Sequence, residues 1–283
     1  MAAEQESEKI GPTAHYTAYV WRRLGLPYAR ELSTTTGALM YWGIFAAGEW
    51  MTRVLPGVPS MPSYLAYRHL LMDALLEEIA PDRLVELGAG LTHRTVEWAL
   101  DRGVESVDVD LPGMIAVKRE ALAKLPSSLQ ARLGQKHRTL AADVLAPEAD
   151  AVLGAALHGA ATAVVLAEGL VSYFDDAGRV QLFATVASAL RRNGGGHFIA
   201  DLHTADAQAK MGGATKTLRS AIRVITRRKE ALAPFATEAA LGDALLHAGF
   251  DGWRIARRDD YVAKKPALAR TRSPAHIVDA WVG

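Results

Sequence analysis

Residues 85–92 read Val-Glu-Leu-Gly-Ala-Gly-Leu-Thr, an apolar run that leads into two closely spaced glycines. The apolar residues over 83–87 predict a short buried strand, and the glycines predict a tight turn into a helix. Glycine lets the backbone approach a ligand closely, although Gly-x-Gly is also typical of an ordinary turn. The dinucleotide-binding fingerprint needs a third glycine at position 93, where this sequence has histidine, so the stretch does not match a pyrophosphate-binding loop.

Helical and strand patterns alternate along the rest of the chain. Strands that alternate with helices of about 10–17 residues predict crossover connections and a mostly parallel sheet. No helix-length pattern separates the last two strands, so we expect them to form an antiparallel pair at the end of the sheet. The predicted strands are 83–87, 106–109, 138–142, 162–167, 196–201, 253–257 and 277–282. The predicted helices are 63–79, 92–101, 113–125, 147–157, 175–191, 237–248 and one near 212–230.

The composition shifts once along the chain. Residues 10–60 are rich in aromatic side chains, and a stretch rich in proline over 56–62 follows them. Proline is excluded from helix interiors and central strands, so this stretch is expected to separate two units. The sequence predicts an N-terminal helical cap or lid over 1–62 and an α/β domain over 63–283. We find no internal repeat that would divide the chain further.

The overall composition excludes several classes of function. The 283 residues carry 32 Lys and Arg against 31 Asp and Glu, and this balance argues against a dedicated nucleic-acid binder. The absence of cysteine excludes disulfides, thiolate nucleophiles and iron–sulfur clusters, and the nine histidines show no strong metal-binding spacing. The first residues do not form a signal peptide, and no apolar run reaches the ~20 residues of a membrane span. We expect a cytoplasmic protein without metal, membrane or nucleic-acid partners.

Carboxylates follow the predicted strands at the edge where parallel sheets bind ligands. Asp110, about 20 residues after the glycines, can accept from both hydroxyls of a ribose, or it can cap the next helix. Asp143 can accept from an adenine amino group or stabilise a turn. Glu168 ends an apolar strand and can bind a ligand's ammonium or pair with an arginine. A ribose, an adenine and an ammonium without a pyrophosphate together indicate S-adenosylmethionine.

Four segments, in their order and spacing, resemble the leucine carboxyl methyltransferase family, which includes bacterial O-methyltransferases of polyketide pathways. The segments are Val85-Glu86-Leu87-Gly88-Ala89-Gly90, Val109-Asp110-Leu111-Pro112 with Lys118-Arg119, Ala142-Asp143, and Ala167-Glu168-Gly169-Leu170-Val171-Ser172-Tyr173. The resemblance covers residues 60–205 well. It implies a class I, Rossmann-like methyltransferase fold: a seven-stranded, mostly parallel sheet with its last strand antiparallel, and helices on both faces.

The resemblance also implies which residues contact S-adenosylmethionine and its product S-adenosylhomocysteine. Asp110 would bind the ribose, Glu168 would lie near the sulfonium and amino group, and Arg68 would pair with the cofactor carboxylate. The complete implied set is Arg68, Glu86, Gly88, Ala89, Gly90, Asp110, Leu111, Asp143, Val144, Glu168 and Gly169. This sequence departs from the family pattern where Thr92-His93-Arg94 replaces Asp-Thr-Arg, and its N-terminal segment matches only vaguely.

Methyl transfer from a sulfonium is an in-line displacement, so an acceptor hydroxyl needs help to lose its proton, whereas a carboxylate needs none. His203 is the first candidate base, with Asp201 to orient it, and Tyr173 could face the acceptor. The structural alternative for His203 is a loop histidine without a chemical role, and the alternative for Tyr173 is a buried aromatic ring. Residues of the aromatic N-terminal segment that could contact an apolar acceptor are His15, Tyr16 and Tyr19.

The leading hypothesis is an S-adenosylmethionine-dependent O-methyltransferase that acts on a hydroxyl or carboxylate of a small molecule, in polyketide or other secondary metabolism. One alternative is a carboxyl methyltransferase of a peptide or protein C-terminus, and another is a non-catalytic protein that binds S-adenosylmethionine. A nicotinamide-dependent dehydrogenase is disfavoured by the missing third glycine. The sequence is compatible with a homodimer and does not identify the acceptor.

Overall fold

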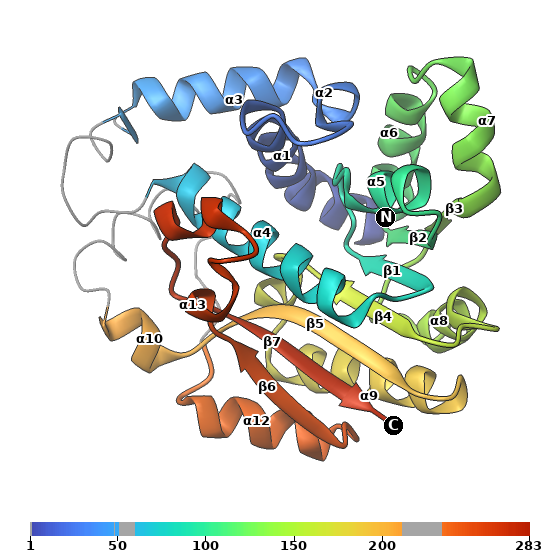
Figure 1. Ribbon diagram of the computed structural model, residues 1–283, viewed down its shortest axis with the longest axis vertical. Helices are drawn as coiled ribbons and strands as arrows, with labels where there is room; N and C mark the ends of the chain where they lie inside the picture. The colour runs from blue at the N-terminus through green and yellow to red at the C-terminus, as the bar shows by residue number, and fades with distance from the viewer. Residues whose placement is uncertain (1, 48, 51–59, 211–233) are drawn as a thin grey trace.

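The computed structural model describes residues 2–47, 49–50, 60–210 and 234–283 (Figure 1). The helix predicted near 212–230 lies outside these described residues. The α-helices are α1 Ala2–Arg23, α2 Ala29–Leu32, α3 Thr35–Ala46, α4 Met61–Ile79, α5 Arg94–Asp101, α6 Pro112–Leu122, α7 Ser127–Lys136, α8 Ala149–Leu157, α9 Asp176–Arg192, α10 Ala205–Lys210, α12 Glu238–His247 and α13 Arg258–Tyr261. The strands are β1 Arg83–Leu87, β2 Glu105–Asp110, β3 His137–Ala141, β4 Ala163–Ala167, β5 Gly196–His203, β6 Gly252–Ala256 and β7 Ala275–Val282.

A seven-stranded sheet with the order β3-β2-β1-β4-β5-β7-β6 organises the chain. Strands β1 to β5 pair in parallel, whereas β7 is inserted between β5 and β6 and runs antiparallel to both. The predicted Rossmann-like sheet with an antiparallel last strand is therefore confirmed, as is the antiparallel pairing of the last two strands. The strand order reverses between β1 and β4, and open α/β sheets bind their ligands beyond the carboxyl ends of strands at such a point.

Helices cover both faces of the sheet because successive strand residues point to opposite sides. Val85 belongs to a core that is completed by α8, α9 and α12, with Phe183 of α9 among its fully buried side chains. The neighbouring Leu84 belongs to a second core, where it is buried together with Leu75 of α4 and Trp98 of α5. All five residues of β1 and of β4 are buried, so these two strands form a rigid base for whatever follows them.

Several helix bounds differ from the sequence prediction by one to three residues, and helices α7, α10 and α13 were not predicted. Helix α4 begins two residues earlier, because the Ser60 hydroxyl accepts a hydrogen bond from the Ser63 backbone N–H at 3.2 Å and caps the helix. Pro62 then occupies the first turn, where its missing N–H costs nothing. Helix α7 was not predicted: it has ten residues, and Leu133 is its one buried residue.

The N-terminal helices α1, α2 and α3 lie side by side, drawn in blue at the top of Figure 1. They pack on one another, and α1 also contacts α4 and α6 of the α/β part. Tyr16 and Val20 of α1, Tyr41 of α3 and Tyr64 of α4 are buried in one common cluster. Among the described residues, no helix is both long enough and apolar enough to cross a membrane.

A buried ion cluster fixes the position of β2. The Asp108 carboxylate lies 2.7 Å from both the Lys118 ammonium of α6 and the His137 ring of β3, and it accepts from the Thr95 hydroxyl of α5 at 2.8 Å. Burial alone would raise the pKa of Asp108, but the charges of Lys118 and His137 hold it at about 2. Lys118 is completely buried, so this carboxylate is its counter-charge inside the fold.

Asp108→Asn is expected to lower the free energy of unfolding by about 3–5 kcal/mol, because it leaves the Lys118 ammonium buried without its counter-charge. Urea denaturation of the variant and the wild type at pH 7 measures the difference. Glu120→Gln is the control, since it breaks only the exposed pair with Lys124 and should leave the unfolding midpoint nearly unchanged. A loss below about 1 kcal/mol for Asp108→Asn would show that the cluster does not hold the fold in this way.

Candidate functional site

A cavity of about 210 Å³ lies beyond the carboxyl ends of β1, β2, β3 and β4 and is covered by α1 and α4. It is therefore located at the reversal of strand order. Every residue that the resemblance implies for cofactor contacts lines this cavity. They are Arg68, Glu86, Gly88, Ala89, Gly90, Asp110, Leu111, Asp143, Val144, Glu168 and Gly169.

The turn after β1 requires glycine at two positions. Gly88 has φ 61°, and a Cβ there would lie 2.8 Å from the Leu170 side chain. Gly90 has φ 50°, and a Cβ there would lie 3.1 Å from Cβ of Ala14 in α1. Both backbone angles are rarely adopted by other residues, and a side chain at either position would also require its close neighbour to shift. The turn thus brings bare backbone to the cavity between the sheet and α1.

Asp110 closes this turn over the end of β2. Its two carboxylate oxygens accept from the backbone N–H groups of Gly90 at 2.6 Å and Leu111 at 2.7 Å. Leu111, and not Asp110, holds the N-cap position of α6, and no side chain caps this helix, so the alternative of a simple helix cap does not describe Asp110. Burial raises the pKa of Asp110, and the two backbone donors oppose the rise. Each oxygen keeps further accepting capacity, which a pair of adjacent hydroxyls could use.

Asp143 stabilises a turn and also lines the cavity. Its carboxylate accepts from the backbone N–H of Leu145 at 2.9 Å, which is the turn-stabilising contact, and the residue also lines the cavity. Val144 lies beside it in the cavity wall and is buried. The pair therefore presents one acceptor and one apolar surface, which suits the edge and face of a planar base.

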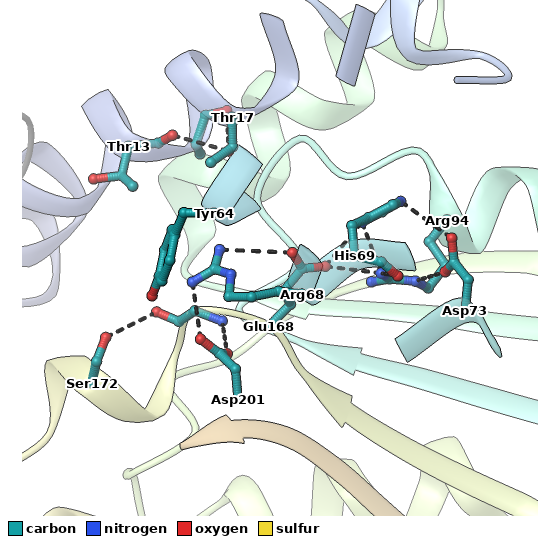
Figure 2. Close-up of polar contacts among 12 residues, drawn as sticks. Thr13, Thr17, Tyr64, Arg68, His69, Asp73, Arg94, Glu168, Ser172 and Asp201 are labelled. Atoms are coloured by element: carbon teal, nitrogen blue, oxygen red, sulfur yellow. Dashed lines mark hydrogen bonds and ion pairs between the residues drawn. The ribbon is translucent and has the colours of Figure 1, made fainter. Parts of the chain in front are cut away.

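Arg94 is the centre of the charged network behind the cavity. Its guanidinium donates to Asp73 of α4 at 2.7 Å, to Glu86 of β1 at 2.9 Å and to Glu168 after β4 at 2.8 Å. The ring of His69 lies 3.0 Å from the same oxygen of Glu168. Figure 2 shows Glu168 between this group and Arg68 on its other side. One buried cation thus joins carboxylates from three elements of the fold.

The charges of these groups follow from that network. Burial would raise the pKa of Glu168, but His69 and Arg94 bring it well below its usual value, so Glu168 is ionised. Burial raises the pKa of Glu86 to about 8, because Asp108 and Glu168 add repulsion and the attraction of Arg94 does not outweigh both effects. Glu86 and Glu168, which both line the cavity, therefore differ in how readily they ionise.

Three buried polar atoms of charged residues in the cavity wall have no hydrogen-bond partner among the described residues, and the hydroxyl of Tyr16 is a fourth, uncharged one. The three atoms of charged residues are Nε of Arg68, Oε1 of Glu168 and Oε2 of Glu86. A buried donor or acceptor without a partner is costly. The set contains one donor from a cation and two acceptors from carboxyl groups. An α-amino-acid group, which carries a carboxylate and an ammonium, would satisfy both kinds.

The structure places the predicted base away from the cavity. Neither His203 nor Asp201 lines it. Asp201 bonds instead to Arg68 at 2.9 Å and to the backbone N–H of Gly169 at 2.5 Å, because a buried guanidinium is a stronger partner for a carboxylate than a neutral imidazole. The expectation that Asp201 orients His203 is therefore corrected: Asp201 positions Arg68, as Figure 2 shows.

His203 is neutral at physiological pH. Burial is the largest of the effects that lower its pKa to about 3, and the charge of Arg68 adds to it. Its Nε2 atom lies 3.0 Å from the hydroxyl of Tyr64, a residue of α4 that does line the cavity. His203 thus contacts the wall of the cavity from behind.

Of the four residues predicted to contact the acceptor, two line the cavity and two do not. Tyr16 lines the cavity, as does Tyr173, whose hydroxyl donates to Thr13 of α1 at 3.1 Å. His15 and Tyr19 do not line it. They lie one helical turn apart and face α3, where His15 bonds to Thr34 at 2.9 Å and the Tyr19 hydroxyl accepts from the Trp42 indole at 3.3 Å.

Sequence reasoning missed Arg94, His69, Asp73 and Tyr64. One available signal was the position of Arg94 in the first turn of α5, where a cation opposes the helix dipole and therefore needs a specific acidic partner. Tyr64 precedes Arg68 by one turn of α4, and its ring lies 5.0 Å from the guanidinium of Arg68. No group of three or more His, Cys, Asp or Glu among the described residues is arranged to hold a metal ion.

Solved structures with a similar fold show only distant likeness. A Nostoc punctiforme PCC 73102 protein, provisionally described as an O-methyltransferase, is 17% identical over 78% of this chain and 60% of its own, with a TM-score of 0.49. The S-adenosylmethionine-dependent methyltransferase SibL is 18% identical over 92% of this chain and 75% of its own, with a TM-score of 0.49. Human N-acetylserotonin methyltransferase is 14% identical over 78% of this chain and 56% of its own, with a TM-score of 0.47.

This chain therefore spans about three fifths of the length of the Nostoc protein, and likeness at this level carries no information about its activity. No curated protein matches the chain significantly. The family model of leucine carboxyl methyltransferase matches residues 27–187, which is more than half of the 283 residues and includes α4, β1 to β4 and the whole turn of Gly88 and Gly90. The chain belongs to the leucine carboxyl methyltransferase family.

Proposed function

We propose that this protein is an S-adenosylmethionine-dependent O-methyltransferase that acts on a hydroxyl or carboxylate of a small molecule. The observation that carries the proposal is the convergence of Asp110, Asp143 and Glu168 on one cavity beside the turn of Gly88 and Gly90. These groups match the ribose, adenine and ammonium of the cofactor, and the turn does not match a pyrophosphate. Family membership supports the same reaction class.

The residues of the cavity fit this cofactor part by part. The free accepting capacity of Asp110 suits the ribose hydroxyls, and Asp143 with Val144 suits the adenine edge and face. The unpartnered Nε of Arg68 suits the carboxylate of the methionine part, and the unpartnered oxygen of Glu168 suits its ammonium. The bare backbone at Gly88 and Gly90 would let the methionine part of the cofactor pass close to the sheet.

The bound cofactor would supply an electrophilic methyl group on a sulfonium, and the protein would supply alignment and a dry site. Arg94 fixes Glu168, and Asp201 fixes Arg68, so both ends of an amino-acid group would be held by side chains that cannot turn away. Helix α1 covers the cavity and limits the access of water. Because His203 is neutral and behind Tyr64, it would orient the Tyr64 hydroxyl and not contact the acceptor itself.

We further propose that residues 1–62 act as a cap on an α/β domain formed by residues 63–283. Gly11, Thr13, Ala14, Tyr16, Thr17 and Trp21 all line the cavity, and all lie on α1. Helix α1 approaches the glycine turn so closely that a Cβ at Gly90 would lie 3.1 Å from Cβ of Ala14. An acceptor would therefore meet both units at once, which is what a cap requires.

Asp110→Asn is expected to weaken S-adenosylmethionine binding by about 10–100-fold, because a neutral amide makes weaker hydrogen bonds to the ribose than a carboxylate does. Calorimetric titration of S-adenosylmethionine and S-adenosylhomocysteine into both proteins measures the change. Asp150→Asn, on the surface at Arg192, is the matched control and should bind like wild type. Absence of binding to wild type would refute the proposed function, and binding without transfer to any acceptor would favour the non-catalytic alternative.

Arg94→Lys is expected to weaken cofactor binding and to lower the free energy of unfolding by about 1.5–3 kcal/mol, because one ammonium cannot bond to Asp73, Glu86 and Glu168 together. Calorimetry gives the affinity and urea denaturation gives the stability. Arg102→Lys is the control, since Arg102 bonds to Glu77 at the exposed surface. If Arg94→Lys kept wild-type affinity, the network would not be what orients Glu168.

A further inference from the structure

Two buried histidines connect Glu168 to the far end of the charged network. His69 of α4 and His93, at the start of α5, are almost completely inaccessible to solvent, and neither lines the cavity. Their Nε2 atoms lie 3.0 Å apart, and Nδ1 of His69 lies 3.0 Å from an oxygen of Glu168. At the other end, Nδ1 of His93 lies 3.4 Å from Glu97, whose side chain is 23% exposed. The two rings thus join a carboxylate of the cavity to one at the surface.

The contacts of this histidine pair call for more protons than two neutral rings carry. Each neutral imidazole holds one N–H. One N–H is needed between the two Nε2 atoms, so a single N–H remains for the two Nδ1 atoms, each of which faces a carboxylate. Nδ1 of His93 is buried and makes no hydrogen bond to the described residues. One additional proton would give both Nδ1 atoms a hydrogen to donate.

Arg94 determines where the protons of the neutral pair lie. Its Nη2 atom lies 2.8 Å from Nδ1 of His69 and can only donate, so this nitrogen accepts and the N–H of His69 is on Nε2. His69 then donates to His93, and the N–H of His93 faces Glu97. In this state no N–H of the pair is directed at Glu168. An additional proton on Nδ1 of His69 would place a positive charge 3.0 Å from the Glu168 carboxylate.

The surroundings of the pair favour one additional proton and disfavour a second. Asp73 lies 3.6 Å from Nε2 of His69, and α1 contributes only the uncharged ring of Trp21. Burial lowers the pKa of His93, and a charge on His69 would lower it further, so the two rings do not both become charged. Among the described residues, the charged groups that face the pair are Asp73, Glu97, Glu168 and Arg94.

We propose, on the basis of the function proposed above, that His69 and His93 are positioning residues that make the binding of the cofactor ammonium by Glu168 depend on pH. When the pair is neutral, Glu168 presents its full negative charge to the ammonium. When the pair holds an additional proton, that charge is partly balanced from behind, and the cofactor is held less tightly. Because this coupling is reciprocal, cofactor that binds at mildly acidic pH drives a proton off the pair.

Calorimetric titration of S-adenosylhomocysteine at about pH 7 and about pH 5.5 tests the proposal. This product carries the amino-acid group without the sulfonium. Over this range its ammonium stays protonated, and Glu86, with a pKa of about 8, keeps its proton. Wild-type affinity is expected to fall by about tenfold towards the lower pH, the effect of a mutual shift of about one pKa unit. Titrations in two buffers of different ionisation enthalpy give the protons released on binding.

Two variants distinguish this role from a purely structural one. His69→Asn places an amide oxygen close to the position of Nδ1, which can accept from Arg94 but cannot take up a proton. It is expected to lose both the fall in affinity and the proton release. Glu97→Gln removes the carboxylate at the far end of the pair and should move the fall in affinity to lower pH, by about half a unit or more. Glu120→Gln, at an exposed pair, is the matched control and should keep the wild-type profile.

The outcomes separate this inference from the function on which it rests. If wild type binds no S-adenosylhomocysteine at either pH, the proposed function fails. If it binds with an affinity that does not fall towards pH 5.5, or if His69→Asn keeps the fall and the proton release, the proposed function stands and the inference is overturned. The same holds if Glu97→Gln and Glu120→Gln have one profile. Circular dichroism at both pH values establishes folding, and Glu97→Gln decides alone if His69→Asn does not fold.

Discussion

The guanidinium of Arg94 is buried and balances carboxylates from α4, β1 and the loop after β4, of which Asp73 keeps 17% of its side chain exposed. Three carboxyl groups in such a place would repel one another and resist ionisation without a nearby cation. The planar fork of arginine has donors in three directions, so a single side chain fixes Asp73, Glu86 and Glu168 together. The position of Glu168 in the cavity, and with it the geometry of the site, depends on this arrangement.

Helix α4 shows how one element serves both the core and the site. Its apolar side chains, among them Leu71 and Leu75, pack on one face of the sheet. The same helix carries Tyr64, Arg68 and His69 towards the cavity and the charged network. Because the apolar face anchors the helix along its length, the backbone that carries the polar side chains is held in a fixed position. The stacking of Trp21 on His69, with ring centroids 4.2 Å apart, extends this rigid region to α1.

Much of the fold and of the candidate site could be predicted from local sequence patterns, since strand ends and glycine turns are encoded over a few residues. The buried runs of β1 and β4, the glycines at 88 and 90 and the carboxylate of Asp110 are all of this kind. The partners of buried charges are not, because they are set by contacts between distant segments. Asp201 was predicted to orient His203, two residues away, yet it bonds to Arg68, which is 133 positions away. Helix α7 was missed for a different reason, since it is short and buries only Leu133.

The place of β7 in the sheet has a consequence for how the protein is made. Strand β6 pairs only with β7 within the described sheet, and β5 has β7 as its second neighbour. During synthesis, β7 is the last of the seven strands to leave the ribosome, so β5 keeps an open edge and β6 has no partner until that moment. Unpaired strand edges are templates for wrong association between chains. The nascent protein therefore passes through a stage in which its sheet is incomplete and most exposed to aggregation, and insertion of the final strand ends that stage.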